Sequence, residues 1–180
     1  AMYSMINITE PGTMVIKKGK KGVLSWFSLP RKRDRPSWEE YFFQIAKQVV
    51  TRSTCMRRQV GAVLVKDKRL LSTGYNGAPR DISHCIEVGC LRDELNVPSG
   101  QRHELCRALH AEQNAIAQAA LHGVKIEGST LYCTHQPGSL CAKMIRNPGI
   151  VEVYFDQSYP DELATGLFAE SGIKLPKLGS

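Results

Sequence analysis

The sequence of 180 residues predicts a single α/β domain, with helices on both faces of a mixed central sheet. Hydrophobic residues recur at helical spacing in four segments, and short apolar runs typical of strands lie between them. The first two such runs are separated by only three polar residues, which indicates an antiparallel hairpin. The expected order of elements is therefore α-β-β-α-β-α-β-α, and the sheet is mixed because only its first pair is a hairpin.

The first half of the predicted domain begins with a helix and a hairpin. Ser37 and Glu40 have the spacing of a capping box, so we expect a helix over 38–52. Apolar runs at 60–65 and 69–74, joined by Lys-Asp-Lys, predict the two strands of the hairpin.

The second half is regular again after about thirty residues without clear periodicity, a long irregular stretch for a small domain. Four of the six cysteines lie in or beside that stretch. Gly172 follows the last periodic segment and is expected to be a helix C-cap. The remaining predicted elements are a helix over 111–121, a strand over 129–134, a helix from Pro137 to a stop at Pro148-Gly149, a strand over 151–155 and a helix over 161–170.

The net charge of +7 lies almost entirely at the N-terminus. Residues 1–36 contain eight basic and two acidic side chains, whereas residues 37–180 contain sixteen and fifteen. We therefore expect a flexible, basic N-terminal arm over 1–36 and a nearly neutral folded domain over 37–180. A neutral domain favours a small-molecule substrate over nucleic acid. No apolar run approaches the roughly 18 residues of a membrane span, and no signal peptide is evident, so we expect a soluble, cytoplasmic protein.

Two predicted helix starts carry residues that can hold a metal. His110-Ala111-Glu112 begins one helix, and Pro137-Gly138-Ser139-Leu140-Cys141 begins the next after a strand. This arrangement resembles the H-x-E and P-C-x-x-C pattern of zinc nucleobase deaminases. In that pattern a His and two thiolates hold zinc, and the fourth position is left to a water whose pKa the metal lowers. The Glu is no ligand and transfers protons. Helix N-termini are expected to favour the thiolate form of the cysteine.

Gly138 departs from this pattern, because it stands where the first cysteine is expected. His110 and Cys141 then remain as matched ligands, and we expect weak zinc binding and slow turnover. Gly138 could be an engineered inactivating change or a natural loss of catalysis. Alternatively, Cys133 or His135, just upstream, replaces the missing ligand. We favour the loss of metal affinity, because Cys133 lies in a predicted strand and is expected to face the core.

Several further motifs, in the same order along the chain, resemble the deoxycytidylate (dCMP) deaminases of bacteria and phages, in the cytidine deaminase superfamily. The resemblance covers roughly residues 36 to 178, and the Gly-Tyr-Asn-Gly turn separates this branch from tRNA-adenosine and free-cytidine deaminases. The motifs are Trp38-Glu39-Glu40-Tyr41-Phe42, Arg52-Ser53-Thr54-Cys55, Val60-Gly61-Ala62-Val63, Gly74-Tyr75-Asn76-Gly77-Ala78-Pro79, His110-Ala111-Glu112-Gln113-Asn114-Ala115-Ile116 and Cys141-Ala142-Lys143-Met144-Ile145.

The resemblance implies a three-layer α/β/α cytidine-deaminase-like fold and hydrolytic conversion of dCMP to dUMP with release of ammonia. It also implies a homo-oligomer, commonly a hexamer, and regulation by dCTP and dTTP. Carried onto this chain, it makes His110 and Cys141 ligands of the catalytic zinc and Glu112 the acid/base. Asn76 is then a contact of the nucleotide sugar. Arg57 and Tyr159 are expected near the phosphate.

Four other cysteines suggest a second, structural zinc that orders the irregular stretch. They are Cys55, Cys85, Cys90 and Cys106, with His103 as an alternate ligand for Cys90 or Cys106 and with His84 nearby. The alternatives are buried free thiols or, in a secreted protein, disulfides.

Three functions compete at this point. The first is a dCMP deaminase impaired by Gly138, and the second is a non-catalytic member of the same family that binds nucleotides and oligomerises. The third, nucleic-acid binding through the basic arm, has little support from the nearly neutral domain.

Overall fold

The computed structural model describes residues 15–18, 24–27 and 34–178, and the chain divides into two compact units, 1–35 and 36–180. In the first unit, strands β1 (Val15–Lys18) and β2 (Leu24–Phe27) pair antiparallel. The sequence pattern gave no signal for these two strands. The rest of the predicted flexible arm lies outside the described residues.

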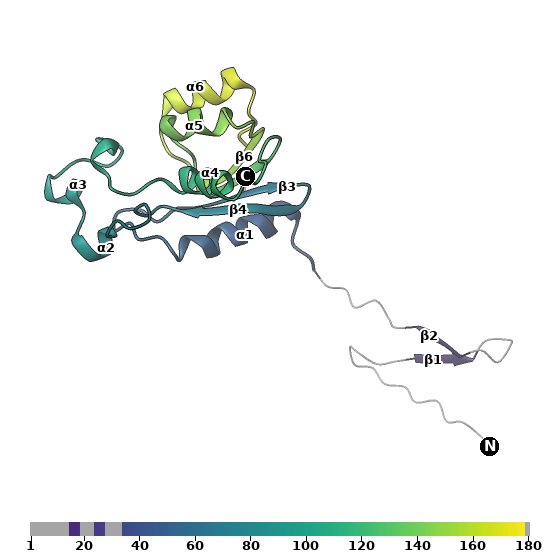
Figure 1. Ribbon diagram of the computed structural model, residues 1–180. Coiled ribbons are helices and arrows are strands. Elements are labelled where there is room, and N and C mark those ends of the chain that lie inside the picture. Colours follow the sequence, from purple (N-terminus) through teal and green to yellow (C-terminus); the bar gives the residue numbers. More distant parts are fainter. Residues whose placement is uncertain (1–14, 19–23, 28–33, 179–180) are drawn as a thin grey trace. The chain divides into compact units, whose positions relative to one another are not determined.

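The second unit is built on a four-stranded sheet of order β4-β3-β5-β6 (Figure 1). Strand β3 (Gly61–Lys66) pairs antiparallel with both β4 (Arg69–Tyr75) and β5 (Thr130–His135), whereas β5 and β6 (Glu152–Gln157) are parallel. The predicted mixed sheet is therefore confirmed. Central strands have both faces covered, and five consecutive residues of β3 are accordingly buried.

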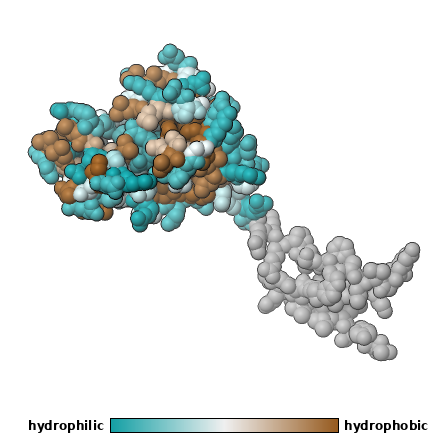
Figure 2. Space-filling model, in the orientation of Figure 1, coloured by the Kyte–Doolittle hydropathy of each residue, from teal (hydrophilic) through white to brown (hydrophobic). Residues whose placement is uncertain are grey.

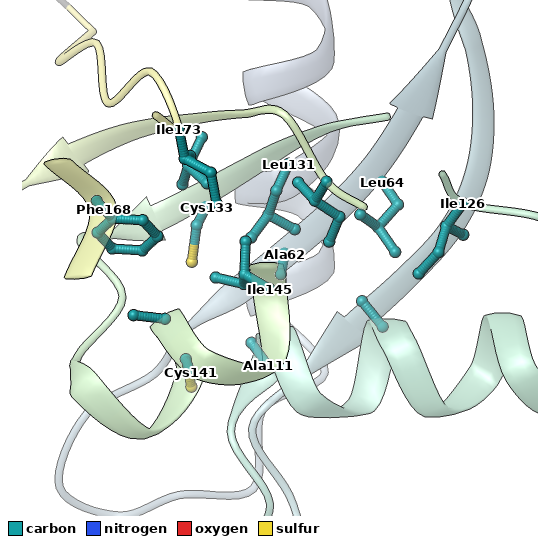
Figure 3. Packing of buried hydrophobic residues seen from close by; sticks show 14 of the residues in the cluster. Ala62, Leu64, Ala111, Ile126, Leu131, Cys133, Cys141, Ile145, Phe168 and Ile173 are labelled. Atoms are coloured by element: carbon teal, nitrogen blue, oxygen red, sulfur yellow. The ribbon is translucent and has the colours of Figure 1, made fainter. Parts of the chain in front are cut away.

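Helices cover both faces of this sheet, which confirms the three layers. Helix α1 lies on one face, and α4, α5 and α6 lie on the other (Figure 1). Because side chains alternate along a strand, Val63 and Val65 of β3 pack with α1, while Ala62 and Leu64 pack with the other helices. The larger core contains Leu131 and other buried apolar side chains, and Figure 3 shows ten labelled members of this cluster, among them Phe168, Ile145 and Cys141.

The helices agree closely with the predicted segments. Ser37 caps α1 through a capping box with Glu40, and Gly172 ends α6 at φ 69°, as expected. One prediction was wrong in detail: Pro137 does not open α5, because Gly138 is its N-cap. The long helices are α1 (Trp38–Val50), α4 (Ala111–Leu121), α5 (Ser139–Arg146) and α6 (Glu162–Ser171).

The irregular stretch between β4 and α4 contains three short helices, α2 (Cys85–Val88), α3 (Leu91–Glu94) and the 3₁₀-helix η1 (His103–Leu105). Apolar side chains reach the surface around α2 and α3 (Figure 2), and Ile86 and Leu95 are among the most exposed of them. No helix in the described part of the chain is both long and apolar enough to cross a membrane.

Candidate metal and nucleotide site

The starts of α4 and α5 bring the predicted metal ligands together. His110 is the N-cap of α4, Glu112 is in its first turn, and Cys141 is in the first turn of α5. One ligand atom from each of these three residues lies within 4.8 Å of the other two, and the His110 Nδ1 is 3.2 Å from the Cys141 Sγ. No other set of three His, Cys, Asp or Glu side chains in the described residues is as close.

The donor set of this cluster suits zinc. Bond lengths of about 2.3 Å to sulfur and about 2.0 Å to nitrogen place two tetrahedral ligands about 3.5 Å apart, close to the observed separation of the His110 and Cys141 atoms. The Glu112 carboxylate is the remaining donor of the cluster. Two matched ligands and a carboxylate therefore fit a zinc ion, although the second thiolate of the deaminase pattern is missing.

Burial sets the protonation of the protein groups in this cluster. The pKa of Glu112 is raised by loss of solvent around a fully buried carboxyl, and the pKa of His110 is lowered by burial and then by the charge of Arg92. The lowered pKa favours the neutral form of His110, which is the form that binds metals. Burial and the neighbouring Glu112 raise the pKa of Cys141, so they outweigh the helix N-terminus that was expected to favour the thiolate.

Gly138 has a backbone conformation that any residue can adopt, with φ −79° and ψ 178°. A Cβ at this position would lie 3.3 Å from Asp161 Oδ2 and 3.5 Å from Tyr159 Cε1, so Asp161 would need to shift by only a few tenths of an ångström. Neither backbone strain nor a severe clash explains why glycine occupies the position.

The two proposed replacement ligands do not join the cluster. Cys133 is fully buried in the core, as expected, and its S–H donates a hydrogen bond to the Glu112 carboxyl, but it does not belong to the close set of ligand atoms. In Figure 3 it lies among the apolar side chains between the sheet and α5. His135 lines the neighbouring cavity, with its Nδ1 3.2 Å from Thr134 Oγ1, and is likewise outside the set.

A cavity of about 530 Å³ opens over the cluster, a size typical of small-molecule sites. The predicted substrate contacts Asn76, Arg57 and Tyr159 all line it, together with Gly138. The Arg58 guanidinium lies over the Tyr159 ring, 5.5 Å from its centre.

Asn76 holds the loop before β3 in place. Its Oδ1 accepts hydrogen bonds from Ser53 Oγ at 2.6 Å and from the Val60 amide at 2.8 Å, and its Nδ2 donates to the Arg58 carbonyl at 2.6 Å. Both lone pairs of the amide oxygen are therefore in use, and one N–H remains for a ligand.

Sequence reasoning missed several residues of this cavity, among them Arg92 and Asp161. The Asp161 carboxylate caps α6 by accepting from the Ala164 amide and also accepts from the Ser139 amide at the start of α5. These hydrogen bonds, first that from Ala164, lower the pKa of Asp161. Its sequence position predicts a cap for α6, but nothing local predicts the bond to α5, 22 residues away.

The four cysteines in or beside the irregular stretch, Cys55, Cys85, Cys90 and Cys106, have free thiols. Burial, followed by the proximity of Cys106, Cys90 and Cys55, raises the pKa of Cys85. They do not form a set of three ligand atoms within 4.8 Å among the described residues. His103, the alternate ligand, packs edge-on against the His110 ring with centroids 5.2 Å apart.

Comparison with known proteins agrees with this site. Residues 36–157 match the model of the cytidine and deoxycytidylate deaminase zinc-binding region. The chain belongs to this deaminase family. Deoxycytidylate deaminases of Schizosaccharomyces pombe and Saccharomyces cerevisiae are each 40% identical to this deaminase-family chain, over 79% and 77% of its length. The matched part of the chain spans only 44% of either yeast protein.

A solved structure extends the likeness to the whole fold. The dCMP deaminase of cyanophage S-TIM5, in complex with dCMP and dUMP, is 28% identical to this deaminase-family chain, with a TM-score of 0.65. The match covers 81% of this chain and all of the phage chain. The expected cytidine-deaminase-like fold is therefore confirmed.

Proposed function

We propose that this chain hydrolyses dCMP to dUMP and ammonia with the help of zinc, and that Gly138 lowers this activity. The observation that carries the proposal is the cluster of His110, Glu112 and Cys141 at the wall of a cavity of nucleotide size. The phage deaminase of the same fold, whose structure contains dCMP and dUMP, supports the choice of substrate.

The reaction places a defined demand on each residue. A zinc ion held by His110 and Cys141 would supply a Lewis acid that makes water a better nucleophile. Glu112 takes a proton from the attacking water and delivers it to the ring nitrogen. It then takes the second proton from the hydroxyl now bonded to the ring carbon and delivers it to the amino group, so that the C–N bond breaks, the carbonyl forms and ammonia leaves. Its burial and raised pKa suit this role, because a carboxyl with a raised pKa takes up a proton more readily and can still pass it on.

Without the second thiolate, metal binding and proton transfer compete for the Glu112 carboxylate. If its carboxylate becomes the third metal ligand, it stops being available for proton transfer. If it stays free, only two protein ligands hold the metal, and zinc binds weakly. Either arrangement lowers the rate.

Restoring the thiolate tests the proposal. Gly138→Cys should raise the zinc content by about one ion per chain and increase dCMP deamination by at least roughly tenfold, because loss of a metal-site group typically costs about 10–100-fold. Zinc is measured by elemental analysis and deamination by the absorbance change from dCMP to dUMP. Gly138→Ala is the matched control, since it adds the Cβ without the sulfur and should leave both quantities unchanged.

A second function is favoured by Gly138 itself. Because no backbone or steric requirement explains the glycine, a chain that binds nucleotides without deaminating them is the alternative. A G138C protein that gains zinc and binds dCMP but releases no ammonia would support this alternative and contradict the first proposal.

The substrate contacts and the second metal are further parts of the proposal. We assign Asn76 to the sugar, with its remaining N–H, and Arg57 and Tyr159 to the phosphate end of the cavity. We also assign a structural zinc to Cys55, Cys85, Cys90 and Cys106, whose mutual proximity supports it, although their sulfurs must draw closer around the ion. The same elemental analysis then gives about one zinc in the unaltered chain and two in G138C.

Assembly and regulation follow from the family resemblance. We propose a homo-oligomer, with a hexamer as the expected size, and regulation by dCTP and dTTP. Light scattering measures the size of the oligomer, and the rate of dCMP deamination with and without each triphosphate measures the regulation.

A further inference from the structure

One wall of the cavity carries a buried cation that the deamination chemistry does not use. Arg92 lies on α3, only 7% of its surface is exposed, and it lines the same cavity as His110 and Glu112. Arginine is almost never this buried unless it is paired. The burial of Arg92 therefore calls for an explanation.

Arg92 has no acidic partner among the described residues. Its Nη2 donates to the Pro98 carbonyl at 3.3 Å, and its buried Nε has no acceptor in the described protein. Arg57, on the same cavity, differs: its Nε pairs with Asp93 at 3.3 Å and its Nη2 donates to the Val97 carbonyl at 2.9 Å. Even so, Arg57 Nη1 is also buried without an acceptor.

The other charges of the cavity do not neutralise Arg92. Asp93 is paired with Arg57, and Asp161 already accepts from two backbone amides at the starts of α5 and α6. Glu112 is buried beside the Cys141 and Cys133 thiols. Arg58, whose guanidinium lies over Tyr159, adds another cation. The balance of charge favours an anionic ligand.

A phosphate group supplies the hydrogen-bond acceptors that the Arg92 and Arg57 guanidiniums lack. It carries negative charge and several acceptor oxygens, which planar guanidinium groups bind through charge-assisted hydrogen bonds. We propose that Arg92, together with Arg57, binds the 5′-phosphate of the nucleotide and thereby selects the nucleoside monophosphate over the free nucleoside. This inference rests on the proposed function, and it adds Arg92 as the residue that determines specificity.

The test compares two ligands that differ only in the phosphate. Calorimetric titration with dCMP and with deoxycytidine is done on the unaltered chain, on Arg92→Met and on Arg69→Met. Arg69 is an exposed arginine on β4 outside the cavity, so R69M controls for the loss of one positive charge. R92M should weaken dCMP binding by roughly 10–100-fold and leave deoxycytidine binding unchanged, whereas R69M should change neither. Equal affinity of R92M and the unaltered chain for dCMP, or an equal loss for both ligands, would overturn the assignment.

Two further measurements keep the result interpretable. Arg92→Lys keeps the charge without the planar fork, and it should lose part of the dCMP affinity even if R92M does not fold; full dCMP affinity in R92K contradicts the proposal. Inorganic phosphate should raise the melting temperature of the unaltered chain and of R69M by the same amount. The rise should be smaller in R92K. If phosphate acts through Arg92 while dCMP does not bind, the anion site stands and the proposed function fails. If dCMP is bound and deaminated without dependence on Arg92, the function stands and this inference fails.

Discussion

The starts of α4 and α5 both contribute side chains to the metal cluster, but only α4 has all the side chains that the deaminase pattern predicts. At α4, His110 and Glu112 are both in place, and the His110 amide donates to Gln113 Oε1 within its own helix. At α5, Cys141 is in place, Gly138 supplies no ligand, and the Ser139 amide donates to Asp161, the N-cap of α6. The start of α5 therefore keeps its helical backbone without a second ligand side chain, because the bond to Asp161 and the packing of Cys141 and Ile145 in the core hold it.

The intact half of the site should show the largest effect. Glu112→Gln keeps the size of the side chain but removes the group that moves protons, so deamination should fall by about 10²–10⁴-fold. The measurement is best made in the G138C background, where the starting rate is higher. Zinc content should remain that of G138C. An E112Q protein with unchanged turnover would show that α4 does not carry the acid/base.

The same residue predicts a pH dependence of stability. Glu112 is buried and its pKa is raised above the ordinary 4.5, so the folded chain keeps a proton that the unfolded chain releases above that pH. Stability from this group is full below about pH 4.5 and is lost as pH rises through the folded pKa, by at most about 1.4 kcal/mol per pH unit.

Urea unfolding of chelator-treated protein between pH 5 and 8 measures this slope. The Gln side chain of E112Q does not titrate, so the free energy of unfolding of E112Q should fall less over this range than that of the unaltered chain. The difference between the two proteins isolates Glu112, because the opposite effect of the lowered His110 pKa is present in both. Parallel curves would contradict the assignment of a protonated, buried carboxyl.

Local signals explain what could be predicted from the sequence. The capping box of Ser37 and Glu40 spans three residues, and Gly172 directly follows its helix, so both are visible without tertiary structure. The cluster of His110, Glu112 and Cys141 was predicted because the spacing within two helix starts preserves the motif. The pattern of apolar runs predicted the mixed sheet, and the family resemblance supplied the three-layer cytidine-deaminase-like fold.

The features that could not be predicted depend on contacts between residues that are far apart in the sequence. Arg92 lies in an irregular stretch without periodicity, and nothing in its neighbours indicates that an arginine there is buried. The bond from the Ser139 amide to Asp161 joins two helices whose contact exists only in the folded chain. His103 was considered as a zinc ligand with the cysteines, but folding places it against His110.

The smallest expected effect compares the two helix starts directly. Asp161→Ala removes acceptors from both the Ala164 and the Ser139 amides, so it should cost about 1–2 kcal/mol of unfolding free energy. Gln113→Ala removes only the acceptor of the His110 amide and should cost about 0.5–1 kcal/mol. Urea denaturation at pH 7 measures both changes.

Asp161→Asn is the control for this pair, because its amide oxygen can still cap α6 through the Ala164 amide while the second carboxylate oxygen, which binds Ser139, is replaced by a donor. D161N should therefore fall between the unaltered chain and D161A. If D161N proved as stable as the unaltered chain, the α5 start would not depend on Asp161. Its geometry would then come from core packing around Cys141 and Ile145 alone, both of which are completely buried.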